Sequence, residues 1–146
     1  MFEQVLDKDV VIAIIIKTDF EKTGIEFFTP PHFSQQLAYM KRPRDYFIEP
    51  HVHNPIPREV VLTQEVLFIK SGKVRVDFYS DEKEYLSSRV LHPGDVILLA
   101  GGGHSFMMLE ESEIIEVKQG PFSGEKDKQR FSAVNENSII VQEKAL

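Results

Sequence analysis

The sequence contains no cysteine. This absence excludes a disulfide framework, a thiolate nucleophile, a zinc finger and an iron–sulfur cluster, and it indicates a reducing compartment. Basic residues are in the minority, with 17 Lys and Arg against 23 Asp and Glu and a formal net charge of −6. Binding to nucleic acid or to an anionic membrane surface depends on Lys and Arg that neutralise phosphates. The charge therefore argues against both kinds of partner.

Long hydrophobic runs are missing as well. The longest, Val10–Ile16, has seven residues, whereas a membrane-spanning helix needs about 20. The first residues carry Glu3, Asp7 and Asp9 where a signal peptide would be basic, so we expect a cytoplasmic protein. A chain of 146 residues can bury roughly 68% of its unfolded surface, so the core needs no structural metal. Any bound metal is then expected to have a catalytic role and not a structural one.

Short apolar or alternating segments rich in Val, Ile, Phe and Tyr follow one another, separated by Gly, Pro, Asp and Asn. This rhythm predicts an all-β fold, with a tight hairpin at Ser71-Gly72 and a Pro-Gly turn at Pro93-Gly94-Asp95. An open sheet would leave long reactive edges, so the pattern favours a sandwich or a closed barrel. The ten predicted strands are Val10–Ile16, Ile25–Phe28, Gln36–Met40, Tyr46–His53, Glu65–Lys70, Lys73–Tyr79, Tyr85–Leu91, Val96–Leu99, His104–Leu109 and Ile114–Lys118.

The chain shows no internal repeat, and we expect a single domain over residues 1–146. Within it we expect N-terminal strands at 10–28, a core barrel at about 36–118 and a C-terminal packing tail at 121–146. The tail is polar and charged before it ends in the apolar run Ile139-Ile140-Val141. We interpret that run as a packing segment, with a docking motif for a partner as the alternative.

Three histidines and a glutamate are spaced as metal ligands would be. His51 and His53 lie two residues apart on a predicted strand, so both side chains share one face at roughly 6.5–7 Å and can converge on one ion. Glu65 opens the next predicted strand, and six residues separate it from the turn glycine Gly72. His104 follows the run Gly101-Gly102-Gly103, which lets the backbone turn sharply.

This arrangement resembles the cupin superfamily. Its first motif places a His-x-His pair, a glutamate and a glycine in that order, and its second places a histidine after a glycine turn and ends in an asparagine. The resemblance covers about residues 45 to 120 and includes Gly94 and Gly101. It implies a double-stranded β-helix, or jelly-roll barrel, in which His51, His53, Glu65 and His104 hold one divalent metal ion. Imidazole and carboxylate ligands suit Fe, Mn, Ni, Zn and Co about equally.

The sequence departs from the family pattern at four places. The first motif lacks its leading glycine. In the second motif, Leu99 stands where proline is usual, and Gly94 lies one residue too close to that position. Met108 stands where asparagine is usual. Eleven residues separate His53 from Glu65, far more than in the family. This insertion makes Glu59 an alternative carboxylate ligand. We favour Glu65, because the register between ligand and hairpin turn is fixed whereas loop length varies.

Strand alternation also predicts the surroundings of the metal. Leu67 shares a face with Glu65, and Phe106 and Met108 share one with His104, so we expect a largely apolar pocket wall. Arg58 and Arg44 flank the ligand strand and are candidates for binding an anionic substrate group, with solvated surface arginines as the alternative. The only candidates for a general base are Glu59 and Tyr39.

The opposite face of the Glu65 strand carries the apolar side chains of Val66 and Phe68. A face that met water would be polar, so we expect an interface there, and the resemblance implies a homodimer. The alternative is that the N-terminal strand Val10–Ile16 covers this face within one chain.

These observations favour a metal-dependent enzyme that acts on a small organic molecule, of the dioxygenase or the isomerase or epimerase type. The alternative is a non-catalytic binding or sensor module for a carbohydrate or an acid. A metal-free sugar isomerase of the same barrel is disfavoured, because it would not need three histidines and a glutamate in ligand register.

Overall fold

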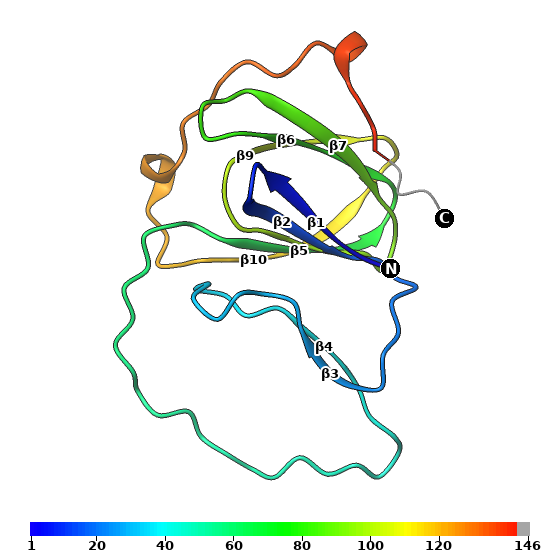
Figure 1. Ribbon diagram of the computed structural model, residues 1–146, viewed down its shortest axis with the longest axis vertical. Helices are drawn as coiled ribbons and strands as arrows, with labels where there is room; N and C mark the ends of the chain where they lie inside the picture. The colour runs from blue at the N-terminus through cyan, green and yellow to red at the C-terminus, as the bar shows by residue number, and fades with distance from the viewer. Residues whose placement is uncertain (143–146) are drawn as a thin grey trace.

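The computed structural model describes residues 1–142. Over this range the protein is all-β, with ten strands in three antiparallel sheets, two short 3₁₀ turns and no α-helix (Figure 1). The elements are β1 Phe2–Asp7, β2 Val10–Ile16, β3 Gly24–Phe27, β4 Ala38–Lys41, β5 Glu65–Ser71, β6 Val74–Tyr79, β7 Tyr85–Leu91, β8 Val96–Leu99, β9 Gly103–Met108, β10 Glu113–Lys118, η1 Gly124–Asp127 and η2 Glu136–Ser138. Within the described part, no helical segment has the length and apolar character needed to cross a bilayer.

Two of the sheets face each other and enclose the main core. The larger has the order β1-β2-β8-β5-β10, and the smaller has the order β7-β6-β9. Alternate residues of each strand point inward, as expected for a sheet with one buried face. The inward side chains form one cluster of Val5, Ile12, Ala13, Ile15, Leu67, Ile69, Val74, Val76, Phe78, Leu91, Ile97 and Leu99.

The two sheets do not close into a continuous barrel among the described residues. At one side, the inward Arg89 of β7 donates to Glu3 of β1 at 3.1 Å and joins the two sheets. At the other side, β9 and β10 follow each other in the chain but end different sheets and do not pair with one another. The all-β prediction is thus confirmed, and on this side the sandwich has free edges at β9 and β10.

Most predicted strands are found within two residues of their expected ends, and Val10–Ile16, Tyr85–Leu91 and Val96–Leu99 match at both ends. The prediction of a strand at Tyr46–His53 was wrong. This segment has no sheet partner in the described chain and belongs to an exposed stretch with four prolines, which lack an amide hydrogen and so restrict a segment to the edge of a sheet. The strand β1 was missed, because its polar residues at Glu3, Gln4 and Asp7 hide the alternation.

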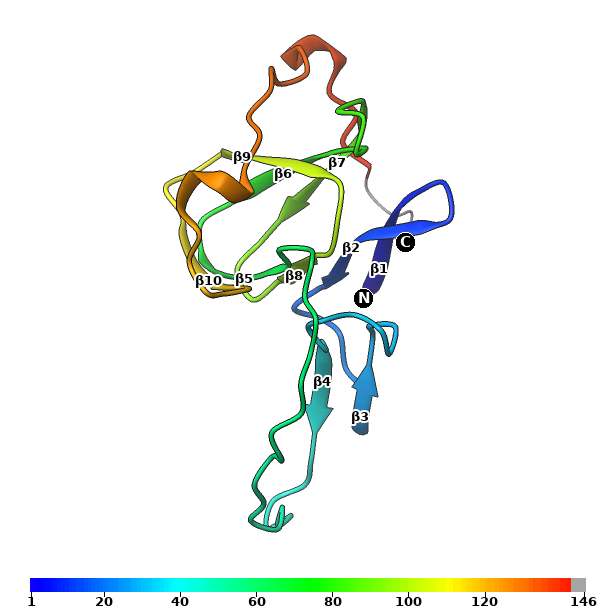
Figure 2. The ribbon, with the colours of Figure 1, turned by 90° about the vertical axis from the view of Figure 1, so that its left-hand side faces the viewer.

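Residues 42–63, which we call the arm, project away from the sandwich (Figure 2). The short hairpin of β3 and β4 leads into the arm, and Gln64 ends it. The buried Gln64 side chain accepts hydrogen bonds from Ser34 Oγ and Gln35 N, each at 3.0 Å. Both ends of the arm are therefore held, while every residue between them is exposed.

A second apolar cluster lies on the outer face of the larger sheet. The loop and hairpin over residues 20–39 pack there on Ile14 and Leu98, and Val66 is covered with them. The strand Val10–Ile16 does not cover this face, because β2 is itself a member of the same sheet. That alternative was wrong. Further along the face, Phe68, Ile115 and Val117 stay exposed.

The C-terminal segment crosses the outer face of the smaller sheet. Phe131 packs edge-on against Tyr79 at 5.0 Å, and Glu136 pairs with Arg75 of β6 at 2.7 Å. Val141 forms a bridge with Ser88 of β7. The last four residues of the predicted packing tail, 143–146, lie outside the described part.

Candidate functional site

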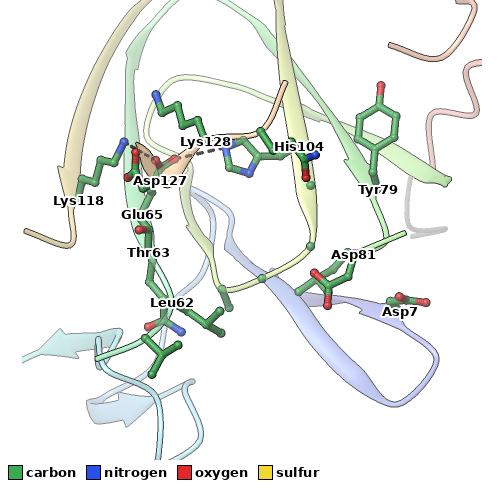
Figure 3. Close-up of a pocket in the computed structure, with 18 of the residues that line it drawn as sticks. Asp7, Leu62, Thr63, Glu65, Tyr79, Asp81, His104, Lys118, Asp127 and Lys128 are labelled. Atoms are coloured by element: carbon green, nitrogen blue, oxygen red, sulfur yellow. Dashed lines mark ion pairs between the residues drawn. The ribbon is translucent and has the colours of Figure 1, made fainter. Parts of the chain in front are cut away.

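Three polar side chains from three strands meet between the sheets, beside the free edges (Figure 3). Glu65 opens β5, His104 lies near the start of β9, and Lys118 ends β10. The Glu65 carboxylate lies 3.3 Å from His104 Nε2 through Oε2 and 3.1 Å from Lys118 Nζ through Oε1. Glu65 is buried and the other two are half-buried, so this triad lies partly sheltered from water.

Strand register explains why these side chains converge. Glu65 lies opposite both Leu99 and Lys118, and His104 lies opposite Phe78, so all of them share the inward face. The turn before β9 depends on glycine at residue 102, where φ is +64° and an added Cβ would lie 2.5 Å from the Tyr79 carbonyl oxygen. His104 follows this turn directly and lies on the inward face.

The surroundings of Glu65 stabilise its ionised form. Contact with His104, and then with the ammonium group of Lys118, lowers the pKa of Glu65 to about 2 against the opposing effect of burial. The same contact with Glu65 raises the pKa of Lys118. The triad thus holds a carboxylate that is ionised at neutral pH, which is the form that binds a cation.

We expect acid to weaken the fold through Glu65. Its folded pKa lies below the unfolded value, so its contribution is complete above about pH 4.5 and is lost as the pH falls towards 2. We expect ionised Glu65 to contribute about 2 kcal/mol to the free energy of unfolding at neutral pH. This is less than the full displacement of its pKa implies, because the site is open to water. Urea unfolding of metal-free wild-type and Glu65→Gln proteins at several pH values measures this. The stability difference should vanish in acid; a constant difference would show that ionisation of Glu65 contributes nothing.

An open-sided cavity of about 1260 Å³ surrounds the triad. Its wall includes Phe106 from β9, Glu116 from β10 and the residues 59–64 at the return of the arm. The segment after β10 adds Asp127 and Lys128, which lie near Glu65 in Figure 3. The cavity therefore combines apolar strand side chains with charged groups of both signs.

The other two predicted metal ligands lie on the arm. His51 and His53 are exposed, and their ring centroids are 5.3 Å apart, so the two imidazoles do lie side by side. His51 Nδ1 donates to the Glu49 carbonyl at 2.9 Å, which leaves its Nε2 free to bind a metal. Neither histidine lines the cavity that holds Glu65 and His104.

The predicted four-ligand set is therefore present as two separate pairs. Across residues 1–142, no group of three or more His, Cys, Asp or Glu residues stands close enough to hold a metal ion. Each pair by itself fits a divalent cation, since imidazole nitrogens and a carboxylate are suitable donors. A complete site requires the two pairs to approach each other.

The remaining predicted residues fall in different places. Phe106 lines the cavity, and Glu59 lies at its mouth but away from any histidine pair. Leu67 is buried in the core beneath the cavity, and Met108 is 46% exposed at the far end of β9. The remaining three lie away from the cavity lining: Arg58 and Arg44 are exposed on the arm, and Tyr39 packs against Phe20 in the outer cluster.

Sequence reasoning missed Lys118. It lies two residues after Glu116 and four after Ile114 on a strand that was predicted, so strand alternation would have placed it inward with Ile114. A lysine at a strand end is usually solvated, so its position in the sequence alone does not mark it as a site residue.

No family model matches the chain, and neither a curated protein nor a solved structure matches it. The function is therefore argued from the residues and the geometry of the site.

Proposed function

We propose that the protein is a metal-binding cupin whose jelly-roll barrel is completed when the arm joins the two sheets. The observation that carries this proposal is the position of Glu65 and His104, 3.3 Å apart on the inward faces of β5 and β9. In this function one divalent ion is held by His51, His53, Glu65 and His104. The ion is Fe, Mn, Ni, Zn or Co, and the compartment is the cytoplasm.

We propose further that the protein is an enzyme that acts on a small organic molecule, of the dioxygenase or the isomerase or epimerase type. His51, His53, Glu65 and His104 would hold the ion, which would supply Lewis-acid or oxygen chemistry when bound. The apolar side chain of Phe106 orients the carbon skeleton of the substrate. The ammonium group of Lys118, beside Glu65, would neutralise an anionic group of the substrate.

Two isosteric variants test the site. Wild-type protein, loaded with each of the five metals and desalted, should retain one ion per chain by elemental analysis. Glu65→Gln should lower the affinity by about 100-fold, because a carboxylate ligand is lost. Glu59→Gln is the matched control at the mouth of the cavity and should bind as the wild type does. Equal binding by wild type and Glu65→Gln, or loss of binding only in Glu59→Gln, would contradict the assignment.

A second candidate function needs no metal. The contact between Glu65 and His104 is that of a carboxylate that orients an imidazole, which is an arrangement suited to proton transfer in a sugar isomerase. Turnover of a sugar derivative that survives removal of metal by a chelator would favour this function. Metal retention without turnover of thiols, diketones, catechols or sugars would favour a non-catalytic binding module.

The exposed side chains of Phe68, Ile115 and Val117 support the homodimer. They lie on adjacent strands of the larger sheet, where Phe68 is opposite Ile115, and so form one apolar patch. Such patches commonly mark interfaces. A second copy that packs on this face would remove the patch from water.

A further inference from the structure

We propose that two copies of the chain exchange their arms, so that each metal site is assembled from His51 and His53 of one copy and Glu65 and His104 of the other. This inference rests on the proposed function for its ligands. Within one chain the two pairs of ligands lie on separate parts of the fold, and the exchange would bring one pair from each copy to a single ion.

The first observation is that the arm has strand-forming residues but no strand. Eight large apolar side chains of the arm are exposed, including Phe47 at 74% and Val52 at 88%; the full set is Tyr46, Phe47, Ile48, Val52, Ile56, Val60, Val61 and Leu62. A segment that leaves so many apolar groups in water is a typical interaction surface. Four prolines, at residues 43, 50, 55 and 57, favour an extended backbone and disfavour collapse of the arm on itself.

The second observation is that the sandwich has free edges beside the half-site. β9 ends the smaller sheet and β10 ends the larger one, and neither edge pairs with another described strand. Free edges offer unpaired amide and carbonyl groups to an added strand. A strand that contains His51 and His53 along β9 would place both imidazoles on one face, and in one of its two possible registers that face is the inward one, next to His104.

The third observation concerns which copy supplies that strand. The hairpin of β3 and β4 and the hydrogen bonds to Gln64 hold both ends of the arm, and between them it extends away from its own sandwich (Figure 2). An arm held in this direction reaches outward to another molecule. Because both copies carry the same arm and the same free edge, a reciprocal exchange closes a symmetric dimer in which no arm is left unpaired.

Mixed dimers test the exchange through metal content. One chain carries His51→Ala and His53→Ala, and a differently tagged chain carries Glu65→Gln and His104→Ala. Neither variant should retain metal by itself. The co-expressed heterodimer, isolated through both tags, should retain one ion per dimer, because one of its two exchanged sites is intact. A heterodimer without metal, where the wild type binds it, would overturn the exchange and leave the proposed function standing.

A disulfide trap tests the exchange without metal, on a background free of native cysteine. Val52→Cys on the arm combined with Met107→Cys on β9 should give a covalent dimer on a non-reducing gel. Val10→Cys with Met107→Cys is the control, because Val10 is also exposed but lies outside the arm. If the protein binds no metal but still forms the covalent dimer, the exchange of arms would be supported and the proposed metal-binding function would be rejected. Monomers with an internal disulfide would show that the arm closes on its own chain and would reject the exchange.

Discussion

The variant His104→Ala is expected to lose at least about 100-fold in affinity for a divalent ion while the protein stays folded. Loss of an outer-shell partner already lowers metal affinity by about 10- to 100-fold, and His104 is proposed as a direct ligand. The fold should tolerate the change because His104 is only half-buried and Glu65 keeps its contact with Lys118 at 3.1 Å. Titration calorimetry of the metal-free protein measures the affinity, and circular dichroism reports the fold.

His92→Ala is the matched control, because His92 lies exposed in the turn between β7 and β8. It should bind metal as the wild type does. Free imidazole should restore part of the binding to His104→Ala, since the truncated side chain leaves room beside Glu65. Wild-type affinity in His104→Ala would remove His104 from the ligand set. Unfolding of this variant with its metal retained would show that the residue is structural.

The variant Arg75→Met is expected to lower the free energy of unfolding by about 3–5 kcal/mol, the cost of removing one partner of a buried ion pair. The Arg75 guanidinium donates to both carboxylate oxygens of Asp77, at 2.8 and 3.1 Å, and to both of Glu136, at 2.9 and 2.7 Å. Asp77 is 3% exposed, so without Arg75 its charge would be buried with only hydroxyl partners, Ser88 and Ser105. Urea denaturation measures the loss.

Two further variants distinguish the two possible causes of this loss of stability, namely the unpaired buried charge of Asp77 and the lost contact with the C-terminal segment. Glu136→Gln removes only an exposed carboxylate and should cost less than about 1 kcal/mol. Arg75→Met combined with Asp77→Leu should regain much of the stability, because it replaces the pair with apolar groups and leaves no unpaired charge. A double variant no more stable than Arg75→Met would show that attachment of the C-terminal segment, and not the buried charge, accounts for the loss.

The two ion-pair systems have opposite consequences for function. Arg75 and Asp77 are closed in by the C-terminal segment, so they stabilise the outer face of the smaller sheet. Glu65, His104 and Lys118 lie beside an open cavity and two free strand edges, where a ligand or a second copy can reach them. Because a ligand can reach Glu65, His104 and Lys118 but not Asp77, the proposed function uses the triad.

The sequence by itself determined the features that depend on neighbouring residues. Alternation predicted that Leu67 shares a face with Glu65 and Phe106 with His104. The glycines at residues 72 and 102 carry the positive φ values of tight turns, but the hairpin predicted at Ser71-Gly72 was wrong, because β5 and β6 belong to different sheets. Both results follow from a side-chain period of two and from steric limits on the backbone, which act over a few residues. The approach of Glu65 and His104 to 3.3 Å was expected only from the resemblance to the cupin superfamily, which implies that both residues bind one metal ion.

Only the tertiary structure decided which segments find a partner. Tyr46–His53 is rich in apolar residues, as a strand is, but stands on an exposed arm, and Gln64 anchors the end of that arm. Lys118 became part of the site only because β10 pairs with β5. A strand is stable when another edge satisfies its amide and carbonyl groups, and that edge can come from a distant part of the chain or from another molecule. Pairing of this kind leaves no local trace in the order of the residues.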